Sequence, residues 1–248
     1  MNLLSYFENV YYINLDEDIN KKEYFTEEIK KSVLHKNYSK YSAVIGKYLD
    51  IRLVPNSIIT EGAKQDIILK KQRSYGISLT YGSLACALSH YYIYMEAKDR
   101  IKPYLIFEDD IILDNNFDND LYNVLEEIKN KNFDIVYLGY NEIPGFSKVD
   151  ISDVLSKPQG LITGLYGYIV SPQGAAKLIK GVFPLNKQID SSISDNIGLL
   201  EAYCSKKNIV GVKTNFGSKT QNQPSCKNEN NYVIPFKKQA DSWDKLFR

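Results

Sequence analysis

The sequence at residues 104–110 is YLIFEDD, an apolar run that ends directly in Glu108, Asp109 and Asp110. Four consecutive bulky apolar residues bounded by polar ones predict a buried strand. Apolar residues recur at helical spacing over residues 79–100 before it, and residues 118–131 after it also favour a helix. Alternating helices and strands of this kind predict an α/β fold with a mostly parallel central sheet flanked by helices.

The three acids are therefore expected at the carboxyl end of a strand, which is where ligands bind in open α/β sheets. Adjacent carboxylates repel each other, and a cation is the simplest neutraliser. Residues one and three of an extended segment point the same way, so Glu108 and Asp110 should face one pocket with Asp109 turned aside. Mg²⁺ and Mn²⁺ bind carboxylate and phosphate oxygens together. A solvated acidic turn is the alternative interpretation.

The remaining chain predicts further elements of both kinds. Strands are expected at 10–15, 38–44, 133–139 and 209–212, and helices at 20–34, 172–180 and 190–206. The stretch 161–171 favours a loop and a strand, and 50–78 favours one or two short helices with a loop. We find no internal repeat and no shift of composition that would mark a domain boundary.

Composition excludes several classes of function. The 248 residues carry a formal net charge of +1, so no overall field favours nucleic acid or an anionic membrane. Three widely spaced cysteines imply neither a zinc site nor a disulfide framework. No apolar run approaches the roughly 18 residues of a membrane span, and no signal-peptide pattern is present. We expect a cytoplasmic protein without a membrane span.

Six segments, taken together and in order, resemble glycosyltransferase family 25, which includes lipooligosaccharide and collagen galactosyltransferases. Most are short, and the helical segment ending in Ser89 and His90 is the strongest of them. The six are 12–15 (YINL), 43–46 (AVIG), 81–90 (YGSLACALSH), 106–110 (IFEDD), 164–171 (GLYGYIVS), and Pro184 with the Ile-Asp pair at 189–190. They span most of the chain.

The resemblance implies a GT-A-like nucleotide-sugar-binding fold in a single domain over residues 1–248. Residues 1–140 would form the half that binds nucleotide and metal, and 141–248 the acceptor side. It also implies a UDP-sugar donor and a divalent cation, Mn²⁺ or Mg²⁺, held by Glu108 and Asp110. The residues implied at the donor site are Asn14, Leu15, Ser89, His90, Glu108, Asp109, Gly164 and Gln221.

The members most similar to this pattern invert the anomeric centre, which requires a base that takes a proton from the acceptor hydroxyl. Asp190 is the candidate by position and by chemistry, and Asp195, about one turn further along the expected helix, is second. A helix N-cap is the alternative role for Asp190. The acceptor would be a hydroxyl of a glycan or of a protein side chain, and the donor sugar galactose or glucose.

The chain also departs from the family pattern. Lys21 and Lys22 stand where the family usually has arginines, and lysine lacks the bidentate fork of a guanidinium. This difference motivates a second hypothesis, a catalytically silent protein that binds a nucleotide sugar or a partner. A phosphoryl- or nucleotidyl-transferase ranks last, because no GxxxxGK[ST] loop is present. The sequence predicts neither an oligomeric state nor a linkage.

Overall fold

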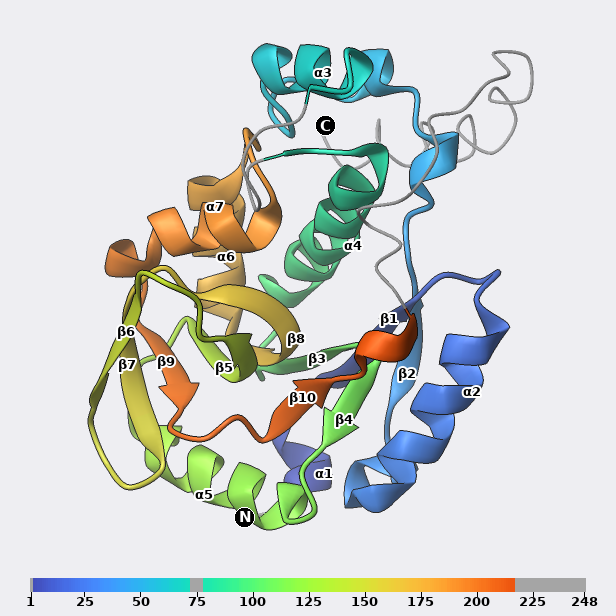
Figure 1. Cartoon of the computed structure of the whole chain (residues 1–248). Helices are drawn as coiled ribbons and strands as arrows, with labels where there is room; N and C mark the ends of the chain where they lie inside the picture. The colour runs from blue at the N-terminus through green and yellow to red at the C-terminus, as the bar shows by residue number, and fades with distance from the viewer. Residues whose placement is uncertain (1, 72–77, 217–248) are drawn as a thin grey trace.

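A mixed eight-stranded sheet runs through the computed structural model, which describes residues 2–71 and 78–216 (Figure 1). The strand order is β2-β1-β3-β8-β5-β9-β7-β6, and β4 and β10 form a separate two-stranded sheet. The strands are β1 Asn9–Asn14, β2 Ser39–Ser42, β3 Tyr104–Glu108, β4 Ile111–Leu113, β5 Ile135–Asn141, β6 Phe146–Asp150, β7 Leu155–Gly160, β8 Thr163–Val170, β9 Ala202–Ser205 and β10 Val210–Val212.

The predicted α/β class with a flanked central sheet is confirmed. β1 pairs in parallel with β2 and β3, and β5 pairs in parallel with β9. β8 lies between β3 and β5 and runs antiparallel to both, and the β6–β7 hairpin adds a further antiparallel pair. A strand from the second half of the chain thus completes the sheet of the first half, so the two halves share one sheet.

Helices cover both faces of the sheet, as Figure 1 shows. On one face α4 and α6 pack on Tyr104 and Ile106, and on the other α2 and α5 pack on Leu105 and Phe107, because successive strand residues point to opposite faces. The helices are α1 Leu3–Tyr6, α2 Ile19–Glu28, α3 Glu61–Ile68, α4 Tyr81–Ala97, α5 Phe117–Ile128, α6 Pro172–Val182 and α7 Ile189–Asp195.

Local sequence explains where the longest helix starts. Thr80 is the N-cap of α4, and its side chain and that of Ser83 form a reciprocal capping box. Most of its residues are buried, including Leu84 and Leu88, which are fully inaccessible. None of the helices within residues 2–71 and 78–216 is both long enough and apolar enough to cross a bilayer.

The prediction of a single helix over residues 190–206 is wrong. The helix α7 ends at Asp195, a 3₁₀ turn follows at Ile197–Leu199, and β9 then pairs in parallel with β5. The segment 202–205 (AYCS) has its ends and its cysteine buried. Burial against the neighbouring strand β5 therefore overrides a helical pattern that the sequence alone favours.

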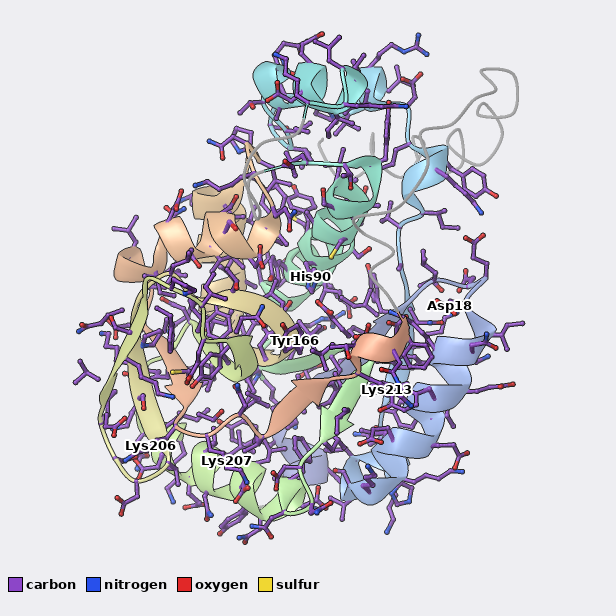
Figure 2. The ribbon with its side chains drawn as sticks, in the orientation of Figure 1. Asp18, His90, Tyr166, Lys206, Lys207 and Lys213 are labelled. Atoms are coloured by element: carbon purple, nitrogen blue, oxygen red, sulfur yellow. The ribbon has the colours of Figure 1, made fainter. Side chains whose placement is uncertain are left out.

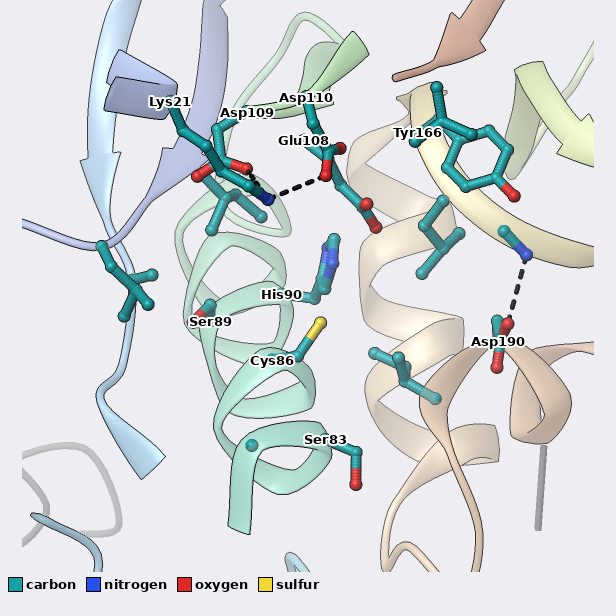
Figure 3. A pocket seen from close by; sticks show the side chains of 18 of the residues that line it. Lys21, Ser83, Cys86, Ser89, His90, Glu108, Asp109, Asp110, Tyr166 and Asp190 are labelled. Atoms are coloured by element: carbon teal, nitrogen blue, oxygen red, sulfur yellow. Dashed lines mark hydrogen bonds and ion pairs between the residues drawn. The ribbon is translucent and has the colours of Figure 1, made fainter. Parts of the chain in front are cut away.

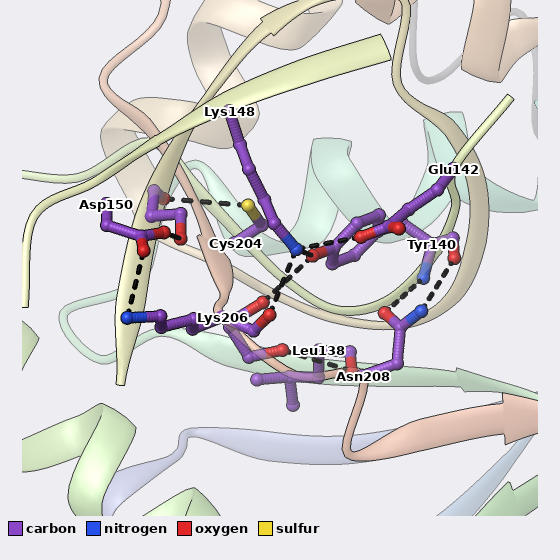
Figure 4. A network of polar contacts seen from close by, with 10 residues as sticks. Leu138, Tyr140, Glu142, Lys148, Asp150, Cys204, Lys206 and Asn208 are labelled. Atoms are coloured by element: carbon purple, nitrogen blue, oxygen red, sulfur yellow. Dashed lines mark hydrogen bonds and ion pairs between the residues drawn. The ribbon is translucent and has the colours of Figure 1, made fainter. Parts of the chain in front are cut away.

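Polar contacts fix the far end of the sheet, next to the β6–β7 hairpin (Figure 4). The Lys148 ammonium donates to the Tyr140 hydroxyl at 2.9 Å, to Glu142 Oε1 at 2.7 Å and to the Lys206 carbonyl at 3.0 Å. Lys206 in turn forms an ion pair with Asp150 at 2.9 Å. This network connects β5, the hairpin and the segment after β9.

Substitution of Gly174 by alanine is expected to destabilise the fold strongly. A Cβ atom at Gly174 would lie 1.9 Å from the Asp134 carbonyl oxygen, where α6 meets the start of β5. Because the atoms that this Cβ would meet all belong to the Asp134 backbone, relief requires the helix to move, at a cost of about 3 kcal/mol or more. Gly62→Ala is the matched control, since nothing lies within 4 Å of that position in α3. Thermal melts should separate the two variants clearly, with Gly62→Ala at or above the wild type.

Candidate active site

A cavity of about 450 Å³ opens at the carboxyl ends of β1 and β3 (Figure 3). Its lining comes from segments far apart in the sequence: the loop after β1, the N-terminal half of α4, the end of β3, the start of β8, the start of α7, and the segment after β10. Figure 2 places Asp18, Tyr166 and Lys213 around this region, whereas Lys206 and Lys207 lie well away from it.

The acidic triplet (Glu108, Asp109 and Asp110) lines the cavity, as expected from its place after β3. The Lys21 ammonium lies between two of its members, 2.9 Å from Asp109 Oδ1 and 2.8 Å from Asp110 Oδ2. Asn14 Nδ2 donates to the other oxygen of Asp109 at 2.8 Å. Burial opposes the charge on Lys21, but attraction to the two carboxylates prevails and raises its pKa.

Glu108 lies on the side of the triplet away from Lys21 (Figure 3). Burial, followed by repulsion from Asp110 and Asp109, raises the pKa of its carboxyl well above the ordinary range. Asp110 Oδ1 is buried and has no hydrogen-bond partner in the part of the chain that the structure describes. Negative charge on these two residues is therefore only partly compensated by protein groups.

Within residues 2–71 and 78–216, no cluster of three or more His, Cys, Asp or Glu side chains is arranged to hold a metal ion. Glu108 and Asp110 nevertheless fit a hard divalent cation, because the unpartnered Asp110 oxygen and the Glu108 carboxyl are oxygen ligands short of positive charge. Such ions commonly take one or two carboxylates from the protein and complete their coordination with substrate phosphates and water.

The residues expected on α4 point in different directions. Ser89 Oγ accepts a hydrogen bond from Val44 N and donates to the Ala85 carbonyl, both at 2.9 Å. Although Ser89 lines the cavity, its hydroxyl thus fixes the segment after β2. The Cys86 thiol, which sequence reasoning did not assign, also points into the cavity in Figure 3, and burial raises its pKa so that it stays protonated.

His90 is buried beneath the acidic triplet. Its Nδ1 lies 2.8 Å from the Tyr168 hydroxyl, which in turn lies 3.1 Å from the Tyr94 hydroxyl. Burial lowers the pKa of His90 to about 4, so the imidazole is neutral near pH 7. A neutral imidazole at the cavity wall can donate or accept a hydrogen bond without adding charge.

Asp190 lines the opposite wall of the cavity. Its Oδ2 accepts a hydrogen bond from Gly164 N at 3.2 Å, and its Oδ1 accepts one from Ser191 N at 2.7 Å.

The N-cap of α7 is Gln188, so the alternative that Asp190 caps the helix is wrong. Asp195 forms an ion pair with Lys187, has a side chain 55% exposed and does not line the cavity. The geometry therefore favours Asp190 over Asp195.

Gly164 has a structural reason to be glycine. Its φ is +84°, and a Cβ atom there would lie 2.9 Å from Cζ of Tyr166. We expect Gly164→Ala to lower stability by about 1–2 kcal/mol and to displace the amide that holds Asp190. The melting temperature should fall, whereas Gly198→Ala, with nothing within 4 Å, should leave it unchanged. A wild-type melting temperature in Gly164→Ala would contradict this structural role of Gly164.

Three further residues expected at the donor site are Leu15, Asn14 and Gln221. Leu15 lines the cavity, and Asn14 lies behind it against Asp109. Gln221 lies outside the described residues.

Sequence reasoning missed Asn141 and Lys213, which line the cavity at the end of β5 and just after β10. Asn141 is the last residue of β5 and Lys213 directly follows β10, so both carry the same sequence signal as the acidic triplet, a polar residue at the end of a strand.

These features define an α/β protein with a pocket at the carboxyl ends of parallel strands and an acidic triplet in the wall of that pocket. The chain belongs to glycosyltransferase family 25: the model of that family, described as "Glycosyltransferase family 25 (LPS biosynthesis protein)", matches residues 7–193. The resemblance seen in the short motifs is thereby confirmed.

Individual relatives agree with this assignment. The chain is 33% identical over 122 residues to "Procollagen galactosyltransferase 1" of Danio rerio, covering 46% of this chain and 20% of that protein. It is 28% identical over 195 residues to "Procollagen galactosyltransferase 1-B" of Xenopus laevis, covering 74% and 30%. It is also 30% identical over 143 residues to "Inactive glycosyltransferase 25 family member 3" of Mus musculus, covering 54% and 23%. The chain thus spans less than a third of the length of these relatives.

Proposed function

We propose that this chain transfers a hexose, galactose or glucose, from a UDP-sugar to a hydroxyl group of a glycan or of a hydroxylated side chain, with inversion and with help from Mn²⁺ or Mg²⁺. The observation that carries the proposal is an acidic triplet whose negative charge is only partly compensated by protein groups. It lines a cavity whose opposite wall presents Asp190. The names of the Danio and Xenopus relatives favour galactose, and the description of the family model favours a glycan acceptor.

The donor side of the cavity is formed by the acidic triplet and its neighbours. Glu108 and Asp110 would hold the divalent cation, which when bound supplies positive charge that stabilises a diphosphate leaving group. Lys213 lies beside them: its backbone N–H donates to the Asp110 carbonyl at 2.7 Å, and its ammonium lies 4.1 Å from the centre of the Tyr24 ring. A lysine there can meet phosphate oxygens as a point charge.

The acceptor side is formed around Asp190. Its carboxylate would take the proton of the acceptor hydroxyl as the acceptor oxygen bonds to the anomeric carbon and the bond from that carbon to the diphosphate breaks. The amides of Gly164 and Ser191 hold the two carboxylate oxygens in place. A single displacement of this kind releases UDP and inverts the anomeric centre.

Incubation with a panel of UDP-sugars in Mn²⁺ or in EDTA tests the proposal, with UDP release as the measurement. Each reaction should be run with and without simple glycan and hydroxylated-peptide acceptors. We expect release from one UDP-sugar that depends on metal and increases with acceptor. Absence of release from every donor and acceptor pair, with no thermal stabilisation by UDP and Mn²⁺, would contradict the proposal.

A second candidate function is a catalytically silent protein that binds a nucleotide sugar or a partner. It is favoured by the 30% identity to a mouse relative whose name begins with "Inactive". It predicts thermal stabilisation by UDP and Mn²⁺ without UDP release under any acceptor condition. The presence of all three acids and of Asp190 in one cavity favours the transferase.

A further inference from the structure

We propose that the Lys21 ammonium is a resident counter-ion of the acidic triplet. It takes one of two cation positions beside the triplet, keeps Asp109 out of the metal's ligand set and limits the pocket to one divalent ion. The inference rests on the proposed function, because it concerns the cation that the transferase would use.

Protein groups contact both carboxylate oxygens of Asp109. Its Oδ1 lies 2.9 Å from Lys21 Nζ, and its Oδ2 accepts a hydrogen bond from Asn14 Nδ2 at 2.8 Å. The side chains of Lys21 and Asp109 are only 11% and 13% exposed. Both oxygens of Asp109 are therefore engaged within the protein, and water screens the ion pair little.

Asp110 differs from Asp109, because only one of its two carboxylate oxygens has a partner among the described residues. One oxygen, Oδ2, lies 2.8 Å from Lys21 Nζ, whereas Oδ1 is buried without a partner among the described residues. Lys21 thus orients Asp110 so that one oxygen is satisfied and the other is left for a further cation. When all three carboxylates are ionised, one ammonium leaves two formal negative charges, which a single divalent ion neutralises.

The position of Lys21 is fixed by its helix. The Asp18 side chain caps α2 by accepting from Lys21 N at 3.4 Å. One turn further on, Phe25 is fully buried and stacks on Tyr12 with ring centres 4.1 Å apart. Residues four apart share a helix face, so burial of Phe25 turns Lys21 towards the triplet. Lys22 is exposed on the same helix and provides a matched control.

The test titrates Mn²⁺ calorimetrically into metal-free wild type, Lys21→Met, Lys21→Arg and Lys22→Met, each with and without UDP. We expect one Mn²⁺ per wild-type chain. Lys21→Met should bind Mn²⁺ at least about tenfold more tightly, since a competing positive charge close to the ion is removed. Lys21→Arg, which keeps the charge, and Lys22→Met should match the wild type. In EDTA, Lys21→Met should melt at a lower temperature, because two buried carboxylates lose their partner.

A role for Lys21 in folding alone predicts the lower melting temperature in EDTA without any gain in Mn²⁺ affinity, and that result would overturn the inference. Binding of two Mn²⁺ ions in the wild-type pocket would overturn it as well, a result that does not depend on whether Lys21→Met folds. Absence of Mn²⁺ binding to the wild type, with or without UDP, is instead the failure of the proposed metal dependence. The two failures are therefore distinguishable.

Discussion

Asp110→Asn is expected to lower metal-dependent UDP release by at least about 100-fold, because it removes one of the two carboxylates assigned to the cation. Asparagine keeps the shape of the side chain and can still accept the Lys21 hydrogen bond, so the fold should persist. UDP release measured with saturating donor and Mn²⁺ gives the ratio directly, and a thermal melt checks that the variant is folded.

The matched control for Asp110→Asn is Asp114→Asn. Asp114 follows β4 only four residues later, but it pairs with Lys207 at 2.8 Å and does not line the cavity. This variant should keep wild-type UDP release. If Asp110→Asn retained release within about threefold of the wild type, the assignment of Asp110 to the cation would be wrong.

Asp190→Asn is expected to lower transfer to the acceptor by about 10²–10⁴-fold, the range typical for loss of a general base. Binding of UDP with Mn²⁺ should stay within about threefold, because Asp190 lies on the wall of the cavity opposite the acidic triplet. Product formation with acceptor and calorimetric titration of UDP, measured on the same preparation, separate the two effects.

Asp195→Asn serves as the control for Asp190→Asn, since Asp195 lies on the same helix outside the cavity and pairs with Lys187. It should leave transfer unchanged. The opposite pattern, with transfer lost in Asp195→Asn and kept in Asp190→Asn, would exchange the roles that we assign to the two residues.

The position of the acidic triplet could be predicted from the sequence because it depends on local patterns. An apolar run of strand length fixes β3, and polar residues at its end must lie at the edge of the sheet. The helix α4 is equally local, since its capping box and its apolar residues are both readable within twenty residues. The family motifs lie on these same elements.

The hydrogen bonds from Lys21 and Asn14 to Asp109 could not be predicted, because they join residues about ninety positions apart. The sequence does contain one relevant signal: Lys21 lies four residues before Phe25, on the apolar face of α2. A lysine on the face of a helix that packs on a sheet needs a buried partner. The identity of that partner depends on how α2 lies against β1 and β3, which is a tertiary property.

The helix α7 ends earlier than the sequence predicts for a related reason. Residues 202–205 have no strong strand pattern of their own, and they become β9 because β5 and β7 lie on either side of them. The same holds for Asp190, whose Gly164 partner belongs to β8, 26 residues earlier. Pairings between distant segments are decided by the assembled sheet, whereas strand and helix patterns within one segment are decided by sequence.

The central claim is that the acidic triplet binds a nucleotide diphosphate through a divalent cation. Calorimetric titration of UDP into the wild type and into Asp110→Asn, each in Mn²⁺ and in EDTA, tests it most directly. We predict that Mn²⁺ tightens UDP binding at least about tenfold in the wild type and does not tighten it in Asp110→Asn. Equal affinity for UDP in Mn²⁺ and in EDTA, in a folded wild-type protein, would contradict the claim.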